Sequence, residues 1–143
     1  MTVGGATAGL EKTVGAVMST ELTTLQLTDT LRLADDMMNL AQVRHFPVLN
    51  GDKPIGILNQ VDLLHASMAS LVQHPKDPPR EILGAIPIKD VMKPIITVTP
   101  ESTIHEAARL MVERDCECLL VMDGSRLAGL VTRTDLLRHL ATQ

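Results

Sequence analysis

The stretch Gly56-Ile-Leu-Asn-Gln-Val-Asp-Leu-Leu64 recurs 73 residues later (129 minus 56), without a gap, as Gly129-Leu-Val-Thr-Arg-Thr-Asp-Leu-Leu137. In each copy a glycine and apolar residues lead to an aspartate followed by a leucine pair. The same spacing extends outward and relates Thr24, Thr30, Ala34, Met38, Val48 and Gly51 to Thr97, Thr103, Ala107, Met111, Val121 and Gly124. An internal repeat decides the fold question. We expect one pseudo-symmetric body with two related clefts.

Each copy has the pattern strand, helix, strand, strand, helix. In the first copy, Asp29 and Thr30 offer N-cap oxygens to a helix whose apolar residues recur every three or four positions. Asn50-Gly51-Asp52 predicts the tight turn of a hairpin. In the second copy, Thr103-Ile-His-Glu106 is a capping box and Asp123-Gly124 is the turn. The predicted fold class is α/β (α+β), with two βαββα motifs packed about a pseudo-twofold axis.

The copies are joined by a proline-rich segment. Pro75, Pro78 and Pro79 end the helix before them and predict a stiff, exposed connection. Short helices are expected before each first strand, at Glu11 to Met18 and at Ile88 to Met92. The predicted organisation is a flexible leader (1–13), a first motif (14–71), a linker (72–87) and a second motif (88–143).

Composition narrows the function classes. The 143 residues are 45% apolar with a formal charge of −4, so the chain can bury a core but has no basic stripe for nucleic acid. Phe46 is the one aromatic residue, which removes the stacking platforms of single-strand binders. A bound purine would therefore have to be held by aliphatic side chains. No apolar run approaches the length of a membrane span, and the N-terminus does not resemble a signal peptide.

Cysteines and methionines predict packing rather than metal chemistry. Cys116 and Cys118 alternate along an extended segment, and no His or Cys lies at a partnering interval, so we expect two small apolar residues entering a strand. The eight methionines fill space that aromatic residues would otherwise occupy. No metal and no tightly held cofactor are expected, and the predicted location is the cytoplasm.

The segment with the most chemistry is the strand-to-helix junction before Asp135. Thr132 and Arg133 begin a helix whose N-terminal amides attract phosphate oxygens, and Arg133 adds positive charge. The Asp135 carboxylate has two acceptor oxygens and no donor, which suits the two hydroxyls of a ribose. Thr97 would add a hydroxyl from the first strand. The same residues also fit an ordinary capped helix start, and the residues alone do not decide between the two.

The repeated pattern, closed in each copy by Gly-hydrophobic-x-(Thr or Asn)-x-x-Asp, resembles the cystathionine beta-synthase (CBS) domain. A tandem pair of such domains is a Bateman module. The resemblance covers Val14 to Leu71 and Ile88 to Leu140, and includes the lead-ins Val-Gly-Ala-Val-Met18 and Ile-Lys-Asp-Val-Met92. The arrangement is similar to short bacterial stand-alone CBS proteins of the kind linked to acetoin utilisation.

The resemblance implies an adenosine-type ligand, such as AMP, ADP, ATP, S-adenosylmethionine or an NAD-type nucleotide. It implies ribose contact at Asp135, phosphate contact at Thr132 and Arg133, and contact with base or sugar at Thr97 and Val98. The matching positions of the first copy are Asp62, Asn59, Gln60, Thr24 and Leu25. Because Gln60 is neutral where the other copy has Arg133, the charge-assisted contribution is absent, and we rank the Asp135 cleft first. His45 is either a phosphate contact that titrates near neutrality or a half-buried strand residue.

Three function classes compete. The first is a regulatory module that binds an adenine nucleotide and signals through an effector protein of unknown identity or through its own homodimer. The second is a structural dimerisation module without ligand. The third, an enzyme, is disfavoured because the sequence offers no nucleophile with a positioned base, no metal triad and no glycine-rich phosphate loop.

Overall fold

The computed structural model describes residues 12–142, which form two compact units. One unit, here called the first-copy unit, runs from Thr23 to Ile95. The other, the second-copy unit, combines the described residues up to Leu22 with the chain from Ile96 onward. The predicted leader falls almost entirely on residues 1–11, outside the described part of the chain.

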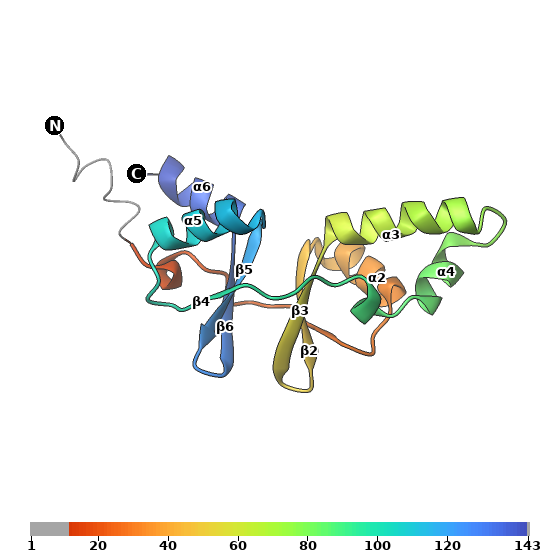
Figure 1. The fold of residues 1–143 in the computed structure, drawn as a ribbon, viewed down its shortest axis with the longest axis horizontal. Coiled ribbons are helices and arrows are strands. Elements are labelled where there is room, and N and C mark those ends of the chain that lie inside the picture. The colour runs from red at the N-terminus through yellow and green to blue at the C-terminus, as the bar shows by residue number, and fades with distance from the viewer. Residues whose placement is uncertain (1–11, 143) are drawn as a thin grey trace. The chain divides into compact units, whose positions relative to one another are not determined.

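The second-copy unit has a three-stranded sheet in the order β4-β5-β6, with α5 and α6 on one side of it (Figure 1). β4 runs parallel to β5, and β5 forms an antiparallel hairpin with β6. The elements are β4 (Thr97–Val98), α5 (Ile104–Arg114), β5 (Cys118–Asp123), β6 (Arg126–Thr132) and α6 (Arg133–Ala141).

The first-copy unit repeats this arrangement as β1-β2-β3 with the same strand directions. Leu25 lies opposite Val48, as Val98 lies opposite Val121, so the repeat spacing of 73 is preserved in the strand register. The elements are β1 (Leu25–Gln26), α2 (Leu31–Ala41), β2 (His45–Asn50), β3 (Lys53–Asn59), α3 (Gln60–Gln73) and α4 (Pro79–Ala85). The predicted βαββα order is therefore confirmed in both copies.

Each unit has its own apolar core between its sheet and its helices. Phe46, the single aromatic residue, is fully buried in the first-copy core. In the second-copy unit, Ile104, Ala107 and Met111 form the buried stripe of α5, as their spacing predicts. The capping box also forms: Thr103 Oγ1 accepts from Glu106 N at 3.0 Å, and Glu106 Oε2 accepts from Thr103 N at 3.2 Å. Local and tertiary signals agree here, which is why this motif could be predicted well.

The two lead-in segments pack on the copy that does not follow them. The turn η1 (Val14–Ala16) places Val14, fully buried, in the second-copy core, and Ser19 pairs with Leu130 of β6. The turn η2 (Ile88–Asp90) places Ile88 in the first-copy core, and the chain then pairs with β3. The domain limits predicted from sequence follow chain order, whereas each compact unit contains the lead-in of the other copy.

The repeated glycines of β3 and β6 are explained by this packing. A Cβ on Gly129 would lie 2.6 Å from Met18 Sδ and 2.9 Å from Ser19 O. A Cβ on Gly56 would lie 2.9 Å from Met92 Cγ. Only a residue without a side chain lets each lead-in approach the strand this closely.

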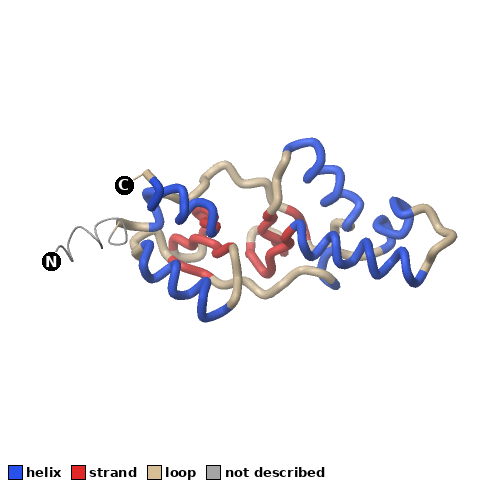
Figure 2. Tube along the Cα trace, turned by 90° about the horizontal axis from the view of Figure 1, so that it is seen from above, coloured by secondary structure: helices blue, strands red, loops and turns tan. Residues whose placement is uncertain are grey.

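The connection between the copies contains a helix that the proline-rich sequence does not predict. α4 begins at Pro79, whose missing amide hydrogen costs nothing at the first helical position. Leu83, 6% exposed, packs in the first-copy core, and Arg80 Nη1 lies 2.7 Å from Asp36 Oδ1 on α2. In Figure 2 this segment is a separate short helix after α3. In residues 12–142, none of the helices has the length and apolar character needed to cross a bilayer.

Candidate ligand-binding sites

Asp135 lies one turn into α6 and is held by the backbone at the end of β6. Its Oδ2 accepts from Thr132 N at 2.9 Å, and its own amide donates to Thr132 Oγ1 at 3.2 Å. The other oxygen, Oδ1, has Arg138 Nη1 at 3.8 Å, a long contact to a guanidinium that is 70% exposed. The hydrogen bond from Thr132 N therefore fixes the carboxylate, and with the side chain 18% exposed, Oδ1 can accept further hydrogen bonds.

Arg133 is directed toward the end of α5. Its Nη2 donates to Cys116 O at 3.4 Å and lies 3.8 Å from Asp115 Oδ1. The Arg133 amide donates to Glu117 O at 3.0 Å, and the Asp135 amide is used by the capping box. Two of the first three helix amides are thus engaged, which leaves fewer phosphate donors than the sequence suggests.

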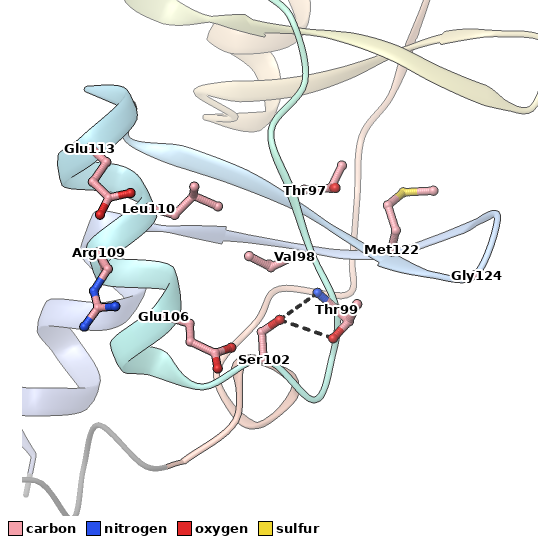
Figure 3. Close-up of a pocket in the computed structure, with 10 residues that line it drawn as sticks. All are labelled: Thr97, Val98, Thr99, Ser102, Glu106, Arg109, Leu110, Glu113, Met122 and Gly124. Atoms are coloured by element: carbon pink, nitrogen blue, oxygen red, sulfur yellow. Dashed lines mark hydrogen bonds between the residues drawn. The ribbon is translucent and has the colours of Figure 1, made fainter.

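Thr97 and Val98 line a surface hollow of about 610 Å³ within the second-copy unit (Figure 3). Thr97 is exposed at the edge of the sheet, while Val98 is 8% exposed and belongs to the core. The hollow is bounded by β4, the turn after β5 and one face of α5, with lining residues Thr99, Ser102, Glu106, Arg109, Leu110, Glu113, Met122 and Gly124. Thr132, Arg133 and Asp135 do not line it, so the predicted site residues of this copy fall into two groups.

The strand register relates the two groups. Thr97 lies opposite Leu120, and Leu120 lies opposite Leu130 on β6, two residues before Thr132. Two strand spacings separate β4 from β6, roughly 10 Å. The two groups therefore lie at the two edge strands of one sheet.

In the first-copy unit the matching polar groups bind one another. Asp62, 6% exposed, accepts from Asn59 N through Oδ2 at 3.1 Å, and its Oδ1 lies 3.2 Å from Lys93 Nζ. His45, half-buried at the start of β2, has Nδ1 2.9 Å from Asn59 Oδ1. Thr24 is exposed just before β1. The structure therefore brings Asn59, His45 and Asp62 together with a residue that sequence reasoning missed, Lys93.

A signal for Lys93 is present in the sequence. Met18 and Met92 align the two lead-ins with an offset of 74 (92 minus 18), and this alignment pairs Ser19 with Lys93. Chain order groups each lead-in with the copy that follows it, and that grouping separates Lys93 from Asp62.

Cys118 occupies the position in β5 that His45 occupies in β2, since they lie opposite Thr132 and Asn59 respectively. It is 5% exposed, as expected for a small apolar residue entering a strand. Burial raises the pKa of the Cys118 thiol far above its ordinary value, and raises the pKa of the Cys116 thiol as well. Both cysteines are free. Over residues 12–142, no cluster of three or more His, Cys, Asp or Glu side chains is placed to hold a metal ion.

Comparison with known proteins assigns the fold. The CBS domain family profile matches residues 14–69 and 88–142. A CBS domain-containing protein from Dictyostelium discoideum is 32% identical over 127 residues, covering 87% of this chain and 88% of its own length. An A-adding tRNA nucleotidyltransferase from Geobacter sulfurreducens is 26% identical over 92% of this chain, but the match spans 14% of the transferase.

Solved structures of similar proteins have the same fold. A candidate acetoin utilization protein from Vibrio cholerae superposes with a TM-score of 0.73 at 27% identity, covering 93% of each chain. The crystal structure of CBSX2 in complex with AMP gives a TM-score of 0.73 at 24% identity, covering 92% of this chain and 97% of the other. With two matched segments and two copies of the βαββα fold, the chain belongs to the CBS-domain family as a tandem pair of CBS motifs.

Proposed function

We propose that this chain is a regulatory module that binds an adenosine-type ligand, of the AMP, ATP, NAD or S-adenosylmethionine class, with Asp135 holding the ribose. The observation that carries the proposal is the geometry of Asp135. One oxygen is fixed by Thr132 N at 2.9 Å, and the other has no closer cation than Arg138 at 3.8 Å among the residues described. A carboxylate fixed in this way accepts two hydroxyl donors without first having to be ordered.

The β4 edge supplies the second half of the proposed site. Thr97 presents an exposed hydroxyl, and the nearly buried Val98 and the side chain of Leu110 add apolar lining, at a hollow of about 610 Å³, a volume in the range of small-molecule sites. In a chain with a single, buried aromatic residue, a purine would have to be held by aliphatic side chains such as these. Two structural neighbours support the ligand class: CBSX2, solved with AMP, and a Methanocaldococcus jannaschii protein suggested to be an archaeal homologue of γ-AMPK.

Signalling would proceed through a partner protein or through the chain's own homodimer. Val61, Leu64, Met68 and Leu71 recur at helical spacing on α3 and are 47–64% exposed. An apolar stripe of this kind is costly to leave in water, so we propose that it is covered in a homodimer. A ligand can move such an assembly only if it binds the alternative arrangements with different affinity.

The second candidate function is a structural dimerisation module without ligand. It is favoured by the internal pairing of the polar groups in the first-copy unit, where Lys93 and His45 already engage Asp62 and Asn59. An enzymatic role has less support, because Asp62 and Asp135 belong to different units and each caps its own helix.

Calorimetry on protein freed of bound nucleotide tests the proposal. Titration with AMP, ATP, NAD and S-adenosylmethionine should give saturable heat with at least one of them, and Asp135→Asn should weaken that binding. Asp123→Asn, a change at an exposed hairpin carboxylate, is the matched control and should bind as the wild type does. Absence of heat with all four ligands would favour the structural module.

A further inference from the structure

Chemically different residues, Ser19 and Lys93, follow the two lead-ins at equivalent places. Ser19 exchanges backbone hydrogen bonds with Leu130 of β6, at N–O distances of 2.9 and 3.0 Å. Lys93 exchanges the same pair of bonds with Ile57 of β3, at 2.9 and 2.8 Å. Ile57 and Leu130 are related by the repeat spacing of 73 (130 minus 57), so Ser19 and Lys93 are structural counterparts.

Because of this difference, the two aspartate carboxylates have different hydrogen-bond and ion-pair partners. Lys93 Nζ lies 3.2 Å from Asp62 Oδ1, and Asp62 Oδ2 is already bonded to Asn59 N. Both oxygens of this nearly buried carboxylate therefore have donors. Near Asp135 the equivalent residue is Ser19, which carries no ammonium. The Asp135 side chain is three times as exposed as the Asp62 side chain, 18% against 6%.

We propose that Lys93 is a tethered competitor that occupies the carboxylate of the first-copy site and makes the two sites of this chain unequal. The inference rests on the proposed function, because it concerns which of the two aspartates accepts a ribose. The Lys93 backbone is pinned by two hydrogen bonds, so its ammonium is always within reach of Asp62. A ribose must displace this donor before its hydroxyls can bind.

The size of the effect follows from the exposure of the lysine. Its side chain is 63% exposed, so the displaced ammonium returns to water easily, although the carboxylate it leaves is nearly buried. Ion pairs between exposed groups contribute little to stability, and pairs with a buried partner contribute more. We expect competition by Lys93 to weaken ribose binding at Asp62 about three- to tenfold.

A phosphate would confuse this measurement, because an ammonium can also bind the anion directly. Adenosine, which has the ribose and no phosphate, separates the two roles. If Lys93 competes for Asp62, its removal tightens adenosine binding. If Lys93 instead serves as a phosphate ligand, its removal leaves adenosine binding unchanged and weakens AMP binding.

The experiment reads each site alone by calorimetry with adenosine. In an Asp135→Asn background, Lys93→Ser installs the residue of the other copy, and Lys93→Met keeps the stem while removing the charge. Both should tighten adenosine binding about three- to tenfold, and adding Asp62→Asn should abolish the gain. Conversely, Ser19→Lys in an Asp62→Asn background should weaken adenosine binding at Asp135.

A readout without ligand keeps the two proposals separable. Lys93 should react more slowly with an amine-methylating reagent than exposed Lys53 does, and Asp62→Asn should remove this difference. Slow labelling at Lys93, together with no binding of adenosine, AMP, ATP, NAD or S-adenosylmethionine to any variant, would refute the proposed function. Equal adenosine affinities at the two sites of the wild type, unchanged by Lys93→Ser, would refute the competitor role while leaving the binding function intact.

Discussion

Val14 is fully buried against Ile104 and its neighbours in the second-copy core, although 90 positions of sequence separate the two residues (104 minus 14). The amides confirm the placement: Val14 N donates to Ser102 O at 2.7 Å, and Ile104 N donates to Lys12 O at 2.8 Å. The segment before the first copy is therefore a structural part of the second.

This placement predicts where a small cavity would act. Val14→Ala removes two buried methyl groups and should lower the free energy of unfolding of the second-copy unit by about 1–3 kcal/mol. Native-state hydrogen exchange would then speed up at Leu119 and Val131 and remain unchanged at Phe46 and Leu58. Faster exchange confined to the first-copy residues would contradict the exchanged lead-ins.

Replacing the two aspartates should affect nucleotide affinity in one order and stability in the opposite order. Asp135→Ala should cost more nucleotide affinity than Asp62→Ala, because the Asp62 carboxylate is already paired with Lys93. Asp62→Ala should cost more stability, by roughly 1–3 kcal/mol, because it removes a buried acceptor and leaves the part-buried amide of Asn59 without its partner. Calorimetry measures the affinities of both variants, and urea unfolding measures their free energies of unfolding. The prediction fails if the same variant loses more of both.

The buried thiol predicts a loss of stability in alkali. Because burial raises the pKa of Cys118 in the folded state, the folded chain retains a proton that the unfolded chain loses above an ordinary thiol pKa of about 8.5. The contribution is fully present below that pH, and it declines as the pH rises further. Urea unfolding at pH 7.5 and 9.5 should show a drop that Cys118→Ala reduces; an identical drop in the variant would exclude the thiol as its cause.

The apolar stripe on α3 predicts a monomerising substitution. Leu64→Glu and Met68→Glu place a charge on side chains that are 54% and 64% exposed in the isolated chain, so folding should be preserved while association is lost. Light scattering should give a dimer mass for the wild type and a monomer mass for both variants. Gln73→Glu, near the end of the same helix, is the matched control and should remain dimeric. A monomeric wild type would refute the homodimer.

Much of the fold could be predicted because it is encoded locally and twice. The stripe of α5, its capping box and the glycine turns at Gly51 and Gly124, with φ of 64° and 62°, all follow from residues close in sequence. Pro79 is a signal for the start of α4, because proline is common at the first position of a helix. Chain order groups each lead-in with the copy that follows it, and only tertiary packing decides which core receives Val14 or Ile88.

The candidate site was harder to predict for a related reason. The position of Asp135 was accessible because its capping partner lies three residues away. Arg133 was expected to face a phosphate, yet its long side chain reaches Cys116 O and Asp115, partners set by the end of α5. The contacts of a long basic side chain depend on the residues that the fold places around it, and the sequence pattern alone does not show these residues.

The exchanged lead-ins also constrain how this chain is made. On the ribosome, Val14 is synthesised before any strand of the sheet that will bury it, and the first copy lacks Ile88 until the connection has been translated. The first-copy unit can therefore complete its core once residues up to Ile95 have been translated. The second-copy unit includes the earliest described residues, so it can complete its core only when nearly the whole polypeptide is present. A cut before Ile88 would leave each fragment with a core that lacks its lead-in residue, Ile88 in one and Val14 in the other, so the pair of motifs is a larger folding unit than the single motif.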